Sequence, residues 1–116
     1  MSSSEETLDE GEHIFHLALA ADWAEAQRSG VYTVSTLGRS LEEEGFIHAS
    51  RRHQIEPVRS MFYDDPGLDV VLLEIDPARL TSPLRLEVPP DADQAFPHIY
   101  GPLDPDAVVG VTPVER

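Results

Sequence analysis

Short apolar runs, several alternating with polar residues, predict most of the β-structure of this chain. A half-buried strand turns successive side chains to opposite faces, so alternation with a period of two is its signature. Residues 13–19 show this pattern, and the pattern of residues 84–88 places Arg85 and Glu87 together on one face. Other runs rich in apolar or β-branched residues predict extended segments at 46–50, 69–75, 99–100 and 108–114.

Apolar residues at helical spacing, bounded by capping residues, predict three helices. We expect Asp22 to cap the first helix and Gly30 to end it. Thr36 or Ser40 can cap the second. Pro57 is compatible with the third only near its first turn, because proline lacks the N–H that a helix interior needs. The first helix is predicted to begin at 20–23, and the second and third are predicted to span 37–44 and 54–63.

The length and the order of elements predict one α+β domain. A chain of 116 residues can form one compact domain with a modest core. The elements run strand, helix, strand, helix and then mostly strands, which is typical of a mainly antiparallel sheet with flanking helices. Residues 1–12 contain five acids and three serines, so we expect a disordered acidic tail there and a single domain over 13–116.

Composition excludes several kinds of chemistry. The chain has no cysteine and no lysine, which rules out disulfides, thiolate zinc sites, cysteine nucleophiles and Schiff-base catalysis. A net charge of −14 opposes nucleic-acid binding, which needs a basic surface. We also see no secretory signal and no run long enough to span a membrane, and we therefore expect a cytoplasmic, bacterial-type protein.

Three histidines lie inside apolar segments and are the main candidates for function. They are His16, His48 and His98. One such histidine is usually a structural hydrogen-bonding residue, but three of them predict a histidine-lined pocket. Their separations of 32 and 50 residues match no local metal-ligand motif, so we expect no metal. His13 and His53 lie beside charged segments and are interpreted as surface residues.

Four further residues are candidates for the pocket. Ser50 and Tyr100 each follow a strand histidine by two residues, so each would lie on the same face as that histidine. Arg85 and Glu87 form either a solvent-exposed charge pair or part of the pocket. In the pocket, Glu87 would act as an acid, as a base or as the acceptor of a hydrogen bond from a hydroxyl group.

Several segments of the chain resemble the DUF952 family of small, biochemically uncharacterised proteins. The resemblance covers residues 13–114 and is strongest in the stretches GFIHAS at 45–50 and FPHIYGPL at 96–103. The run IFHLA at 14–18 and Trp23 also contribute to it. Proteins of this family are thought to be similar in fold to ADP-ribosyltransferases. The resemblance therefore implies a split, two-lobed β-sheet with flanking helices and a cleft for NAD.

The resemblance also implies roles for individual residues. His16 falls where the first strand of such enzymes carries a histidine that holds the nicotinamide ribose. Ser50 or His48 would match the second motif position. Glu87 is the candidate for the glutamate of a late strand, with His98 as a substitute.

We therefore expect an NAD- or nucleotide-handling enzyme, with NAD as candidate cofactor and a small molecule or nucleotide as partner. The predicted catalytic residues are His48, Glu87 and His98, and the predicted ligand-binding residues are His16, Ser50, Arg85 and Tyr100. Two alternatives use the same pocket. One is a non-catalytic small-ligand-binding domain, and the other is an NAD-independent enzyme with His48 and His98 as an acid–base pair. A structural or interaction protein is a further alternative.

Overall fold

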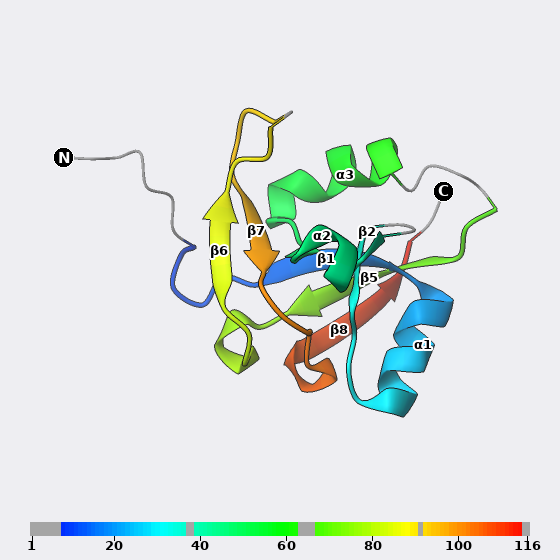
Figure 1. The fold of residues 1–116 in the computed structure, drawn as a ribbon. Helices are drawn as coiled ribbons and strands as arrows, with labels where there is room; N and C mark the ends of the chain where they lie inside the picture. The colour runs from blue at the N-terminus through cyan, green and yellow to red at the C-terminus, as the bar shows by residue number, and fades with distance from the viewer. Residues whose placement is uncertain (1–7, 37–38, 63–66, 91, 115–116) are drawn as a thin grey trace.

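Two three-stranded antiparallel sheets form the framework of the protein in a computed structural model, which describes residues 8–36, 39–62, 67–90 and 92–114 (Figure 1). The first sheet has the order β1-β5-β8, with strands Ile14–Leu19, Val70–Ile75 and Val108–Pro113. The second has the order β4-β7-β6, with strands Ile47–His48, Phe96–Ile99 and Leu84–Glu87. A two-stranded sheet pairs β2 (Val34–Thr36) with β3 (Arg39–Ser40). The predicted class, a small α+β domain with antiparallel sheets, is confirmed.

The two larger sheets meet at a bridge between Phe15 and Ser50. The N–H of Phe15 donates to the carbonyl of Ser50 at 2.8 Å, and the N–H of Ser50 donates back at 2.7 Å. Strand β1 therefore has β5 on one side and the segment after β4 on the other. Ile14 to Ala18 are all buried, because apolar clusters pack on both faces of β1.

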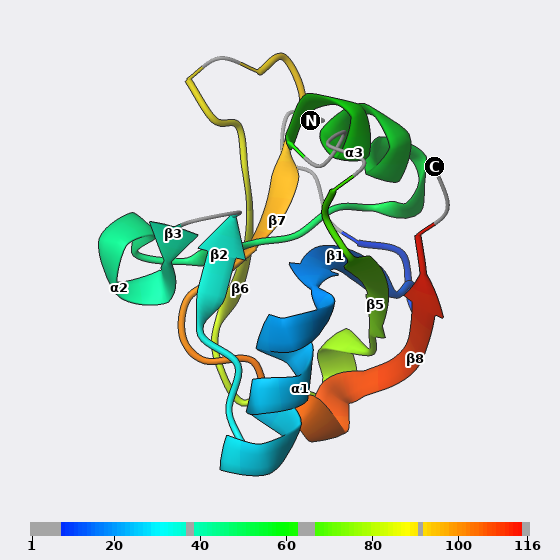
Figure 2. The same ribbon diagram turned by 90° about the vertical axis from the view of Figure 1, so that its right-hand side faces the viewer.

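Helix α1 (Ala20–Ser29) covers one face of the first sheet and α3 (Ile55–Phe62) covers the other (Figure 2). Trp23 of α1 packs in the main core with Ile14 and Leu73. Val58 of α3 packs in a second cluster with Leu17, which lies on the opposite side of β1. The apolar face of the second sheet closes the main core.

The sequence correctly predicts the C-terminus of α1 but not its N-cap. Gly30 ends the helix at φ 89°, as predicted. The prediction that Asp22 is the N-cap is wrong, because the chain passes from β1 into the helix at Leu19. Asp22 lies instead in the first turn, where a carboxylate favours the positive end of the helix dipole.

The other two helices are shorter than predicted at their N-terminal ends. Helix α2 (Leu41–Glu44) begins at a capping box between Ser40 and Glu43, because Arg39 and Ser40 pair with β2 instead of extending the helix. A 3₁₀ turn, η1 (Arg52–Gln54), precedes α3. Pro57 lies in the first turn of α3, as expected. Residues 37–38 and 63–66 of the predicted helices and turn lie outside the described residues.

Two 3₁₀ turns and the central strand of the second sheet complete the fold. The predicted turn after β5 forms η2 (Pro77–Arg79), and η3 (Pro105–Ala107) leads into β8. Strand β7 begins at Phe96, earlier than predicted, and includes Pro97 although it is the central strand. The carbonyl of Pro97 accepts the N–H of Ala49 at 2.9 Å, so the proline still contributes to the sheet as an acceptor. No helix of the described part of the chain is both long and apolar enough to cross a membrane.

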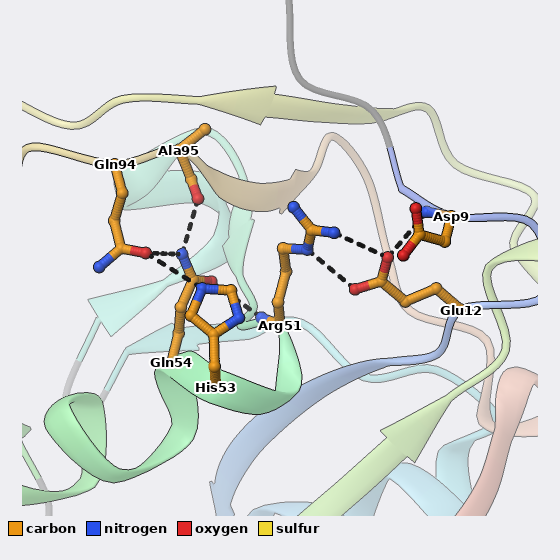
Figure 3. A network of polar contacts seen from close by, with 7 residues as sticks. All are labelled: Asp9, Glu12, Arg51, His53, Gln54, Gln94 and Ala95. Atoms are coloured by element: carbon orange, nitrogen blue, oxygen red, sulfur yellow. Dashed lines mark hydrogen bonds and ion pairs between the residues drawn. The ribbon is translucent and has the colours of Figure 1, made fainter.

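Polar contacts tie residues 9–12 and the loop before β7 to the segment that follows β4 (Figure 3). Arg51 donates to both carboxylate oxygens of Glu12 at 2.8 and 2.9 Å. Composition predicts a disordered tail as far as residue 12, but it cannot reveal a partner 39 residues away. Residues 1–7 of that predicted tail lie outside the described residues. Gln54 donates to Gln94 and to the carbonyl of Ala95, both at 2.8 Å.

Candidate functional site

One face of the second sheet carries a row of aromatic and polar side chains. The register pairs His48 with His98 and His98 with Arg85. Since faces alternate along each strand, the residues at even steps from these share their face. The opposite face carries Ile47 and Ile99, which are fully buried in the core. The aromatic and polar face comprises Phe46, His48, Arg85, Glu87, Phe96, His98 and Tyr100.

A cavity of about 560 Å³ lies between part of this face and α3. His48 and His98 line it together with two phenylalanines of the same face. Met61 of α3 lies at its exposed edge. The remaining walls come from β2, β3, α2 and the loop before β7. The complete lining in the described residues is Thr36, Arg39, Glu44, Phe46, His48, Pro57, Val58, Met61, Pro89, Pro90, Ala92, Phe96 and His98.

His98 is held on two sides. Its Nδ1 lies 2.9 Å from Oε1 of Glu87, and the hydroxyl of Tyr100 donates to the same oxygen. The ring of Phe46 stacks on the imidazole, with centroids 4.0 Å apart and planes at 11°. The hydrogen bonds from Tyr100 and then from His98 lower the pKa of Glu87, and the bond to Glu87 raises the pKa of Tyr100.

His48 faces His98 across the strand pair, with ring centroids 5.5 Å apart. On the side away from β7, the backbone of His48 forms hydrogen bonds with side chains. The N–H donates to Oγ of Ser35 at 3.2 Å, and the carbonyl accepts from Nδ1 of His16 at 2.6 Å. Burial, followed by the proximity of His98 and His16, lowers the pKa of His48 to about 4. The His48 imidazole is therefore neutral at physiological pH.

His16 has both ring nitrogens bonded to protein groups. Its Nδ1 donates to the carbonyl of His48, so its Nε2 accepts from the hydroxyl of Tyr32 at 2.9 Å. Burial lowers the pKa of His16 to about 4, against the effect of the bond to His48. A ligand would have to displace one of these two bonds to reach His16. The arrangement is that of a structural histidine joining β1 to β4.

The other predicted ligand-binding residues lie outside the larger cavity. Ser50 lines a separate cavity of about 10 Å³ with His16 and His48, which is too small for more than a single water. Glu87, Arg85 and Tyr100 are not among the described residues that line the larger cavity. The guanidinium of Arg85 lies over the Tyr100 ring, 5.4 Å from its centroid.

Sequence reasoning missed most of the cavity wall. Phe46 and Phe96 each precede a candidate histidine by two residues, so the same face argument could have included them. Arg39 and Glu44, which form an ion pair at 2.9 Å beside the cavity, carried no such signal because they come from other elements. In the part of the chain that is described, no group of three or more His, Cys, Asp or Glu side chains is placed to hold a metal ion.

Solved structures of one bacterial protein are similar to this chain. The crystal structure of protein CC0527 from Caulobacter crescentus is similar, with a TM-score of 0.76 and 24% identity over 89% of this chain and 86% of that one. Its solution NMR structure gives a TM-score of 0.71 at 24% identity, over 89% and 84% of the two chains. At this identity the similarity shows the fold alone.

No curated protein matches the sequence. The model of a family described as "Protein of unknown function (DUF952)" matches residues 17–111, which is most of the chain. This protein therefore belongs to the DUF952 family.

Proposed function

We propose that this protein binds NAD or a related nucleotide in the cavity between α3 and the second sheet, and that it acts on this ligand with His48 and His98 as an acid–base pair. One observation carries the proposal. His48 and His98 are register partners on adjacent strands, and both line a cavity of about 560 Å³. Small-molecule sites commonly have volumes of about 300–1,000 Å³ and few polar groups among apolar walls.

The chemistry of the walls supports a ligand with a flat ring and an anionic group. Phe46 and Phe96 offer aromatic surfaces on one side, and Pro57 and Met61 offer apolar surface on the other. Arg39 is the cationic side chain among the described lining residues. A guanidinium is a natural partner for a phosphate, which would compete here with Glu44, the present partner of Arg39.

The proposal includes an ADP-ribosyltransferase-like fold. Two three-stranded antiparallel sheets that meet at the bridge between Phe15 and Ser50 are consistent with the split sheet that such a fold requires. When nicotinamide leaves NAD, positive charge develops on the ribose, and a carboxylate would stabilise it. Glu87 is bonded to His98 and is absent from the described cavity lining, so we assign it a positioning role through His98. His16 supports β4 in this proposal.

A non-catalytic binding domain is the second candidate, and one observation favours it. The pKa of His48 is lowered to about 4, whereas an efficient general base or acid has a pKa near the working pH. A neutral His48 is well suited to donate or accept a hydrogen bond from a bound ligand. The same observation weakens the third candidate, an NAD-independent enzyme with the same acid–base pair.

Calorimetric titration with NAD, followed by an assay of nicotinamide release, tests these candidates. The variants are His48→Ala and His98→Ala, with His13→Ala as the control, because His13 pairs with a glutamate of the first sheet away from the cavity. We expect saturable binding that each cavity variant weakens by at least about tenfold and the control leaves unchanged. Binding with nicotinamide release supports the enzyme, and binding without it supports the binding domain. Absence of binding at millimolar NAD would overturn the NAD proposal.

A further inference from the structure

Nε2 of His98 is a buried polar atom without a partner. It is the one buried side-chain nitrogen or oxygen of the described residues that has no hydrogen-bond partner. The His98 side chain is only 3% exposed, and the residue lines the cavity. A buried polar atom that remains unpaired is unfavourable, so native proteins rarely leave one without a reason.

The contacts of Glu87 determine what this nitrogen can do. Oε1 of Glu87 receives hydrogen bonds from the hydroxyl of Tyr100 and from Nδ1 of His98. These two bonds favour the ionised carboxylate, which can only accept. Nδ1 of His98 must therefore carry a proton. In the neutral imidazole, Nε2 is then without a proton and is a hydrogen-bond acceptor.

The ring has little freedom to escape this arrangement. Phe46 stacks on one face of the imidazole at 4.0 Å, and β7 is the central strand between β4 and β6. Flipping the ring would move Nδ1 away from Glu87 and would remove one of the two donors that Oε1 of Glu87 receives. In the neutral imidazole, these contacts thus make Nε2 the nitrogen that accepts.

We infer that the cavity selects ligands that donate an N–H or O–H hydrogen bond to Nε2 of His98, and that Glu87 is the positioning residue that sets this selection by holding the proton on Nδ1. The inference rests on the proposed function, because it assumes that the cavity is the ligand site. It narrows the ligand class to a flat ring that carries a donor, such as a carboxamide or an amino group. The flat ring matches the aromatic walls at Phe46 and Phe96.

Two probes with the same ring and the same carbonyl test the selection. Nicotinamide and methyl nicotinate share the ring and the carbonyl, but the first has an N–H donor where the second has a methoxy group. We expect nicotinamide to bind at least about tenfold more tightly in NMR titrations, since an unpaired buried acceptor is left when the ester binds. Glu87→Gln should reduce this ratio severalfold, because an amide can donate to Nδ1 as well as accept from it.

Glu74→Gln is the matched control for Glu87→Gln. Glu74 also bonds a histidine Nδ1, that of His13 at 2.6 Å, and its side chain is 36% exposed, as is that of Glu87. It belongs to the first sheet and is not among the described residues of the cavity lining. We expect the ratio of the two affinities in Glu74→Gln to equal that of the wild type.

The protonation of His98 gives a readout that does not depend on a ligand. In ¹H–¹⁵N spectra of the imidazole rings at pH 8, we expect the ring proton of wild-type His98 on Nδ1. In Glu87→Gln, we expect this proton to exchange between Nδ1 and Nε2. A proton on Nε2 in the wild type, equal binding of the two probes, or an unchanged ratio in Glu87→Gln would overturn the inference while leaving the site intact. If neither probe binds at millimolar concentration, the proposed site itself is wrong.

Discussion

Nδ1 of His16 donates a hydrogen bond to the backbone carbonyl of His48 at 2.6 Å, across the junction of the two three-stranded sheets. His48 lies on the edge strand β4, and its N–H is bonded to the side chain of Ser35. Side chains thus take the place of a neighbouring strand beside His48. His16 positions a residue of the cavity although it is not among the described residues that line that cavity.

Removing the His16 side chain should therefore destabilise the fold. His16→Ala leaves the carbonyl of His48 and the hydroxyl of Tyr32 without this partner and opens a space in the core, so we expect a loss of about 2–4 kcal/mol in the free energy of unfolding. Tyr32→Phe removes the bond to Nε2 of His16 but keeps the aromatic ring, and it should cost about 1 kcal/mol. Urea denaturation measures both. Equal stabilities of His16→Ala and wild type would contradict the structural role.

Stability should fall as the pH drops from about 6.5 to about 4. The pKa of His16 and that of His48 are lowered from 6.5 to about 4, chiefly by burial. Between these pH values the unfolded chain binds protons that the folded chain does not. The free energy of unfolding therefore has its full value above about pH 6.5 and decreases as the pH falls to about 4. Each pKa unit corresponds to about 1.4 kcal/mol, so His16 alone accounts for about 3 kcal/mol at pH 4. Denaturation at several pH values should show a shallower slope in His16→Gln than in the wild type, and equal slopes would contradict the assignment to His16.

Gly101 should tolerate substitution less well than Gly30. Both have positive φ, at 153° and 89°, which disfavours a side chain. A Cβ at Gly101 would collide with the side chain of Ser82, whereas a Cβ at Gly30 would meet nothing within 4 Å. We expect Gly30→Ala to cost about 1 kcal/mol and Gly101→Ala clearly more, because overpacking adds to the backbone strain. Thermal unfolding of the two variants compares them, and a smaller effect at Gly101 would contradict the packing argument.

Gln54 should be more important for stability than its partner Gln94. The buried amide of Gln54 donates to Gln94 and to the carbonyl of Ala95, and its oxygen accepts the N–H of Arg51 at 2.9 Å. Gln54→Ala leaves the buried carbonyl of Ala95 without this donor, so we expect a loss of about 2–3 kcal/mol. Gln94→Ala removes an exposed partner and should cost below about 1 kcal/mol. Similar losses in the two variants would show that the buried contacts do not dominate.

Arg39 should distinguish ligands with a phosphate from ligands without one. If the cavity binds a nucleotide, Arg39→Gln should weaken adenosine monophosphate severalfold and leave adenosine unchanged, because only the phosphate interacts with the guanidinium. Arg79→Gln is the control, since the Arg79 side chain is 60% exposed against 58% for Arg39 and is likewise paired with an acid. Isothermal titration measures both ligands. Equal effects on the two ligands would contradict a phosphate site at Arg39.

The sequence by itself determined the local elements and the sharing of faces. The strands at residues 14–19, 70–75 and 84–87 follow from alternation and β-branched composition. Gly30 and Gly45 end their helices because glycine adopts positive φ without strain. The steps of two residues that put Tyr100 beside His98 and Glu87 beside Arg85 are also local, since side chains alternate along any strand.

Only the tertiary structure decided which faces meet and what each histidine does. All three histidines look alike in sequence, since each lies in an apolar run. In the fold His16 is enclosed between two sheets and bonded at both nitrogens, His48 is neutral in the cavity, and His98 is held by Glu87. These differences depend on strand order, register and the placement of α3, which bring together residues 11 to 50 positions apart. Pairings at such separations depend on the burial of the whole chain, so no local pattern could encode them.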